Sequence, residues 1–166
     1  GGNYEAKTGQ TIVLLDGAKM ADGETITNLA VAQVGEGENV QYYTSLAAAF
    51  NQTSPVEVKL IGDCTVTEAI NIGEGEGKDI TLDLNGHTIT CSTKPADWEK
   101  GAYYVFDVNG GKLTVTDTSA DQTGQVIAKS ADHNQWLFKL SKGELNLAKG
   151  KYETSIACVV LGADED

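Results

Sequence analysis

Asp83 and His87 have side chains that could do chemistry, a carboxylate and an imidazole four positions apart. They lie in the stretch "DITLDLNGHTIT" (79–90), on either side of an Asn-Gly pair. Calcium binding needs six or more oxygens, usually from several carboxylates. The positions that correspond to Asp83 in the neighbouring repeats, described below, are Lys59 and Thr116, so no acidic cluster forms. We therefore expect Asp83 to face outward and pair with Lys59, His87 to belong to a turn, and no metal to bind here.

Two loops carry residue types suited to binding a sugar. The stretches "STKPADWEKGAY" (92–103) and "KSADHNQW" (129–136) fall at the same point of successive repeats, so we expect them to lie side by side. Aromatic rings stack on the CH groups of a sugar ring, and polar groups bond its hydroxyls. The expected ligand-binding residues are Asp97, Trp98, Glu99, Tyr103, Asp132 and His133.

Two other interpretations of these loops stay open. Trp98 could fold back over the side of the molecule while Trp136 is simply core. A carboxylate pair for glycoside hydrolysis could be drawn from Asp97, Glu99 and Asp132, and Lys100 or Lys129 would be the basic residue that a lyase needs. No acidic and basic strip converges elsewhere, so we predict no catalytic residues and no cofactor.

Composition narrows the class of protein. The chain has 166 residues, 19 glycines, two prolines and a net charge of −12, which is consistent with one soluble domain rich in tight turns. The negative charge argues against nucleic acid and against an anionic membrane surface as partners. No run approaches the length of a transmembrane helix, and no signal peptide is visible, so we expect a mature or trimmed chain.

The three cysteines, Cys64, Cys91 and Cys158, are odd in number and lack C-x-x-C spacing. On the repeat alignment, Cys64 and Cys91 stand in adjacent turns but four positions out of register. That offset separates them by about 14 Å, beyond disulfide reach. We expect buried free thiols.

A threefold strand pattern recurs along the chain and positions all these groups. Alternating apolar residues open four segments, which begin at Val56, Asp79, Lys112 and Glu144. In each, a second short strand and then a third follow, and a glycine turn leads to the next segment. The residues Tyr104, Phe106 and Val108 correspond to Trp136, Phe138 and Leu140 at an offset of 32, while the first repeat spans 24 residues.

Three short strands per repeat, with length differences confined to loops, predict a parallel β-helix of about four coils over residues 54–166. An antiparallel sandwich would explain the alternation but not the three-strand offset.

The stretch 42–53 predicts a capping helix with Thr44 or Ser45 as N-cap, lying over the first coil. Residues 1–41 predict two strands around Asp22-Gly23, as a hairpin or a partial coil. At the far end, "VVLGADED" shows no capping element. We therefore expect the strand edge of the last coil to be covered by a longer parent chain, by dimerisation or by the acidic tail.

The phrases "LDLNGHTI" and "GGKLTVTD" resemble those of bacterial surface proteins of gut anaerobes that carry pectate-lyase-like right-handed parallel β-helix domains. The resemblance covers about residues 42–166. It implies a right-handed helix, secretion, attachment to the cell surface and membership of a longer multidomain chain, but no reaction.

The sequence therefore predicts a non-catalytic, adhesin-like module that binds a polysaccharide or a host or surface protein through its corner loops. A polysaccharide lyase or glycoside hydrolase is the alternative from another class, and a purely structural stalk is the third.

Overall fold

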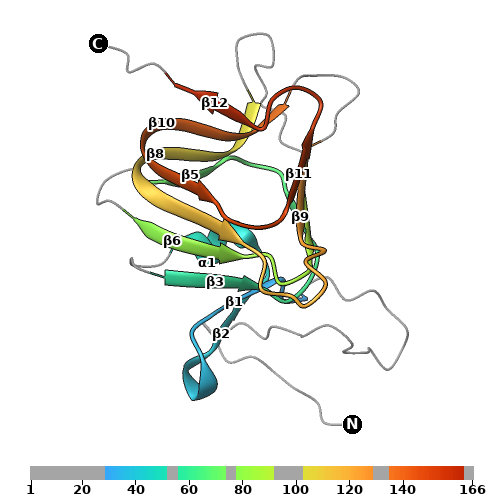
Figure 1. Ribbon diagram of the computed structural model, residues 1–166. Coiled ribbons are helices and arrows are strands. Elements are labelled where there is room, and N and C mark those ends of the chain that lie inside the picture. The colour runs from blue at the N-terminus through green and yellow to red at the C-terminus, as the bar shows by residue number, and fades with distance from the viewer. Residues whose placement is uncertain (1–28, 52–55, 74–77, 92–102, 129–134, 163–166) are drawn as a thin grey trace.

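A computed structural model of the chain describes residues 29–51, 56–73, 78–91, 103–128 and 135–162. These residues form an all-β structure with mostly parallel strands (Figure 1). The elements in chain order are β1 (Ala32–Val34), the 3-10 helix η1 (Gly37–Asn39), β2 (Gln41–Tyr43), α1 (Leu46–Phe50), β3 (Val56–Leu60), β4 (Cys64–Val66), β5 (Ile70–Ile72), β6 (Asp79–Asp83), β7 (Thr88–Cys91), β8 (Tyr103–Thr116), β9 (Gln125–Ala128), β10 (Gln135–Leu147), β11 (Lys151–Thr154) and β12 (Val159–Leu161).

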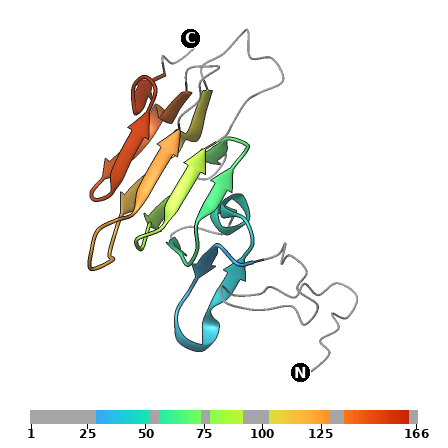
Figure 2. The ribbon, with the colours of Figure 1, turned by 90° about the vertical axis from the view of Figure 1, so that its right-hand side faces the viewer.

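The parallel strands fall into three series, which the chain visits in turn. The first series is β3, β6 and the second halves of β8 and β10. The second series is β4, β7, β9 and β11, which lie in this order across one sheet and appear as green to red arrows in Figure 2. The third series is β5, the first halves of β8 and β10, and β12. Parallel pairing within every series rules out the antiparallel sandwich for these strands.

The pairing register confirms the offsets read from the repeats. Trp136 pairs with Tyr104 and Phe138 with Phe106, at the predicted spacing of 32 residues. Val56 pairs with Ile80, as the shorter first repeat requires. Because inward residues alternate with outward ones, this register stacks apolar side chains of one turn on those of the next.

Glycines allow the third series to continue directly into the first. The sequence predicted a turn at this corner, but β8 and β10 instead run through it as single strands that bend at Gly110 and Gly143, where φ is 105° and 102°. The corners of successive turns touch: a Cβ on Gly143 would lie 2.1 Å from the carbonyl oxygen of Gly111. Only glycine fits such a stack, because it lacks Cβ and tolerates positive φ.

Aromatic rings form a column through the core. The ring centroids of Phe50 and Phe106 lie 5.8 Å apart, those of Phe106 and Phe138 lie 5.4 Å apart, and Phe138 meets Tyr152 edge-on at 5.8 Å. The three phenylalanines are almost completely buried, whereas Tyr152 is half-buried. The column thus links α1 to the last turn described and carries much of the apolar burial that holds the stack together.

The N-terminal end of the stack is closed differently from the prediction. Strand β1 pairs antiparallel with both β2 and β3, so the open edge of β3 is covered by a strand and not by the helix. Helix α1 is shorter than the predicted 42–53, and Ser45 caps it by accepting a hydrogen bond from the backbone N–H of Ala48. Its buried residues Leu46, Ala49 and Phe50 cover the interior. Of the two strands predicted around Asp22-Gly23, the first (11–20) lies outside the described residues, whereas the last three residues of the second (24–34) form β1.

None of the helices in the described part of the chain is long and apolar enough to cross a membrane.

Candidate functional site

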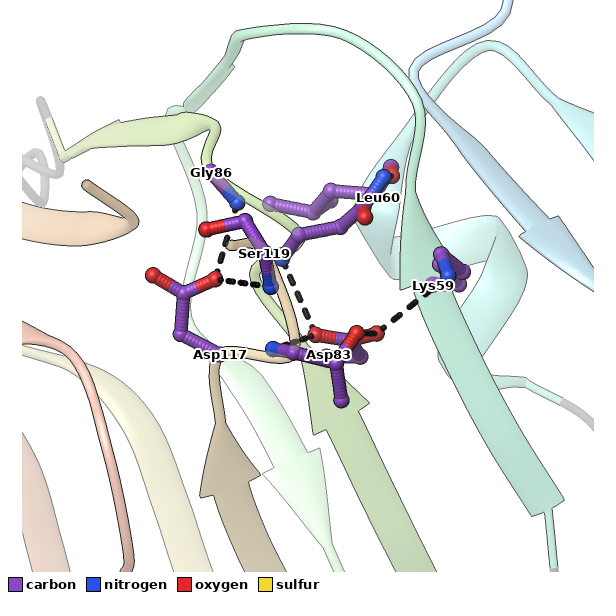
Figure 3. A network of polar contacts seen from close by, with 8 residues as sticks. Lys59, Leu60, Asp83, Gly86, Asp117 and Ser119 are labelled. Atoms are coloured by element: carbon purple, nitrogen blue, oxygen red, sulfur yellow. Dashed lines mark hydrogen bonds and ion pairs between the residues drawn. The ribbon is translucent and has the colours of Figure 1, made fainter. Parts of the chain in front are cut away.

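Asp83 alternates along β6 with the inward residues Ile80 and Leu82, as expected of an outward position, but it is buried. Its side chain is only 1% exposed at the end of β6. One carboxylate oxygen accepts hydrogen bonds from the backbone N–H of Asn85 at 3.0 Å and of Thr118 at 2.9 Å, and the other accepts from the Thr118 hydroxyl at 2.6 Å. The predicted ion pair is confirmed, with Lys59 Nζ 3.7 Å from the second oxygen (Figure 3). The backbone N–H and the hydroxyl of Thr118, in the neighbouring turn, bond both oxygens, and this contact buries the side chain.

Asp117 has the same role one turn further along. Its carboxylate accepts backbone N–H bonds from Gly86 at 3.0 Å and Ser119 at 3.1 Å (Figure 3). It also accepts one from Gly124 at 2.7 Å. Burial by itself raises the pKa of Asp117, but the nearby Ser119 hydroxyl and the three backbone N–H groups outweigh it and lower the pKa below its ordinary value. Asp117 is thus a charged carboxylate at neutral pH, held by fixed donors.

The turns between the first and second series are tied to one another through these carboxylates. Asn85 and Gly86 both have positive φ, which confirms the predicted turn, and Asn85 Nδ2 donates to the carbonyl of Leu60 at 2.9 Å. His87 Nδ1 lies 3.5 Å from a carboxylate oxygen of Asp63, so the imidazole is placed against that group and not against Asp83. We conclude that this corner has a structural role, because its side chains bond successive turns to one another.

The outer face of the first series carries paired charges. Lys112 Nζ lies 3.4 Å from Glu144 on the neighbouring strand, and the side chain of Asn146 donates to Glu144 at 2.7 Å. These hydrogen bonds, from Asn146 first and then Lys112, lower the pKa of Glu144. No group of three or more metal-binding side chains comes together among the described residues.

The predicted sugar site falls mostly outside the described residues. This is true of Asp97, Trp98, Glu99, Asp132 and His133, whereas Tyr103 is the first residue of β8. The strand ends that carry the two loops are neighbours, because Tyr103 pairs with Gln135 and β7 pairs with β9. Trp136 is half-buried, so its assignment to the core is correct only in part.

One polar group near these strand ends was missed. Asp107 is 9% exposed, and one of its carboxylate oxygens has no hydrogen-bond partner among the residues that the structure describes. The other lies 3.9 Å from Lys139 Nζ, which stands 5.0 Å from the centre of the Tyr104 ring. Lys139 and Asp107 pair in register, as the 32-residue offset between the repeats predicts. That offset could therefore have revealed this ion pair from the sequence.

The cysteines are free thiols, as predicted, but the predicted register of two of them is wrong. Cys64 pairs with Ile89 and Val66 with Cys91, so Cys64 and Cys91 are offset by two positions and not four. Aligning Val56 with Asp79 instead of with its partner Ile80 accounts for one position of this error. The connection from Asp83 to Ile89, which is one residue longer than that from Lys59 to Cys64, accounts for the other. An offset of two residues and one strand still separates the Cα atoms by about 8 Å, too far for a disulfide.

We expect Cys64 and Cys91 to react slowly with thiol reagents in the folded protein. Burial first, and then the nearby Asp63 carboxylate, raise the pKa of Cys64 to about 11, while burial first and Cys64 second raise that of Cys91 to about 12. At pH 8 a thiol with a pKa near 11 is about one-thousandth thiolate, and the thiolate is the reactive form. In a Cys158→Ser variant, labelling by Ellman's reagent should be at least about a hundredfold slower than in denaturant. Equal rates in the two conditions would contradict the burial of both thiols.

Comparison of the chain with family models, with curated proteins and with solved structures gives no significant match.

Proposed function

We propose that this chain is a right-handed parallel β-helix that serves as a non-catalytic binding module of the cell surface. Its partner would be a polysaccharide or a host or surface protein, held by the corner loops 92–102 and 129–134. The likeness of "LDLNGHTI" and "GGKLTVTD" to surface proteins of that fold supports the extracellular location. Three parallel series visited in turn support the architecture.

The observation that carries the proposal is where the loops are attached. Both connect the second series to the third, and their strand ends are neighbours through the pairs β7–β9 and Tyr103–Gln135. These two connections are also longer than their counterparts at the same corner, 67–69 and 155–158. Insertions at one corner of a repeat structure are typical of a binding surface. The first loop contains Trp98 and two carboxylates, Asp97 and Glu99, and the second loop contains a third carboxylate, Asp132.

A non-catalytic role is supported by how three of the described carboxylates are used. Asp83 and Asp117 are held by fixed donors of neighbouring turns, and Glu144 is paired with Lys112. A glycosidase needs two carboxyl groups on either side of the scissile bond, one to transfer a proton and one to attack or activate water. Carboxylates occupied in this way do not offer that arrangement.

A glycan array tests the proposal. We expect the purified chain to bind a polysaccharide, and Trp98→Ala to weaken that binding at least about tenfold because a stacked aromatic ring is lost. The matched control is Tyr42→Ala, which removes an exposed aromatic ring from β2 at the opposite end of the stack. Binding lost equally in both variants would contradict a corner-loop site.

Two further outcomes separate the alternatives. Release of shortened or unsaturated sugar from the bound glycan would replace the proposal with a hydrolase or lyase. A folded protein that binds neither any glycan nor any surface protein would favour a structural stalk.

A further inference from the structure

The chain contains two Asn-Gly pairs, Asn85-Gly86 and Asn109-Gly110, which can undergo the same spontaneous reaction. The backbone nitrogen of the glycine loses its proton and attacks the side-chain amide carbon of the asparagine, because no glycine Cβ hinders the approach. The bond from that carbon to the amide nitrogen breaks, and ammonia leaves with the proton. Water then opens the succinimide ring, on one side to aspartate and on the other to isoaspartate. The fold decides whether either pair can react.

The fold holds both reacting groups of Asn85-Gly86. The Gly86 N–H donates to Asp117 at 3.0 Å, and the side-chain amide of Asn85 donates to the carbonyl oxygen of Leu60 at 2.9 Å (Figure 3). Asp117 is fully buried and charged at neutral pH. Deprotonating an N–H group that is bonded to this carboxylate would set two negative charges against each other. The ring can therefore close only after the turn has opened.

Asn109-Gly110 consists of the same residue types in a different setting. It lies in β8 at the corner where the third series continues into the first, and both residues are exposed. The register of β8 with β10 passes from Asn109–Lys142 to Gly111–Gly143 and skips Gly110. A strand residue that is skipped in this way is left unpaired. Among the described residues, no side chain bonds the Asn109 amide or the Gly110 N–H.

We propose that Asn109-Gly110 is a site of spontaneous deamidation in the folded protein, whereas the fold protects Asn85-Gly86 from the same reaction. The reaction needs water as its only co-reactant. It goes beyond the proposed function and does not depend on it, because the corner loops connect the second series to the third and this corner connects the third to the first.

The product alters a corner at which successive turns lie close together. A Cβ on Gly110 would lie 3.3 Å from the carbonyl oxygen of Gly73 in the preceding turn. Isoaspartate at position 109 lengthens the backbone by one carbon at this contact. Aspartate leaves the backbone unchanged and adds a negative charge opposite Lys142 on β10, which is a favourable pair.

Peptide mapping by mass spectrometry tests the proposal, with Asn85 as the internal control. The folded full chain is kept at pH 8 and 37 °C, sampled over days and digested at acidic pH, at which the ring closes slowly. We expect Asn109 to deamidate at least about tenfold faster than Asn85. In a concentration of urea that unfolds the chain, we expect the two rates to agree within about threefold, because the turn no longer holds Asn85.

Asn109→Gln is the matched variant, because glutamine keeps the amide but has to close a larger ring. The modification assigned to position 109 should disappear, and the rate at Asn85 should stay within about twofold. Circular dichroism confirms that the variant and the wild type are folded. Equal rates at the two pairs in the folded chain overturn the proposal. So does a folded chain in which neither pair reacts, or a difference between the pairs that persists in urea.

Discussion

Gly143→Ala is expected to lower the free energy of unfolding by about 3 kcal/mol or more. Gly143 has a φ of 102°, a conformation that residues with a Cβ rarely adopt. An alanine Cβ would also lie 2.1 Å from the Gly111 carbonyl oxygen and 3.0 Å from its nitrogen, both rigid backbone atoms in the adjacent turn. The two turns would have to separate, which breaks the pairing of β10 with β8 on both sides of the corner.

Urea denaturation followed by circular dichroism measures this loss. Gly62→Ala is the control, because Gly62 lacks the positive φ and its Cβ would meet only an ordinary contact at 3.5 Å. We expect that control to change the free energy of unfolding by less than about 0.5 kcal/mol. Gly73→Ala, whose Cβ would lie 2.1 Å from the backbone nitrogen of Gly111, should behave like Gly143→Ala. Equal urea midpoints for Gly143→Ala and Gly62→Ala would contradict the close stacking of the corners.

The repeat offsets were predictable because strand register depends on local alternation. Inward residues must stay inward from turn to turn, so the sequence spacing between Tyr104 and Trp136 or Ile80 and Leu113 directly predicts the strand pairs. The turn at Asn85-Gly86 was predictable for a similar reason, since both residue types tolerate the positive φ that it needs.

The features that were missed depend on contacts between different turns of the stack. Asp83 looked like an outward residue of a strand, and its burial comes from Thr118, 35 residues later. One of the two positions by which the predicted register of Cys64 and Cys91 was wrong comes from a single extra residue in one connection, which the first-series spacing does not reveal. The covering of β3 by β1 required knowledge of a long-range antiparallel pair, whereas the helical pattern of 46–50 was evident locally. The corner-loop residues stay a prediction, because most of them lie outside the described residues.

Among side-chain truncations in the turns between the first and second series, Asp117→Ala is expected to be the most damaging. We expect it to lower the free energy of unfolding by about 3–5 kcal/mol. Asp117 is fully buried, and three backbone N–H groups from Gly86, Ser119 and Gly124 donate to it. Removing the carboxylate leaves these donors without their acceptor in two adjacent turns. Asp121→Ala, at an exposed carboxylate in the same connection, should cost less than about 0.5 kcal/mol.

The dependence on pH separates the charge of Asp117 from its shape. Because folding lowers its pKa, the ionised form stabilises the fold above the unfolded-state pKa of about 3.9, and this contribution is lost as the pH falls through the lower folded-state value. Asp117→Asn keeps the size of the side chain but has no charge to lose. Urea midpoints measured from pH 7 to pH 3 should therefore fall less in Asp117→Asn than in the wild type or in Asp121→Asn. An unchanged fall in Asp117→Asn would mean that other carboxylates carry the acid sensitivity and that the fixed donors hold Asp117 without stabilising its charge.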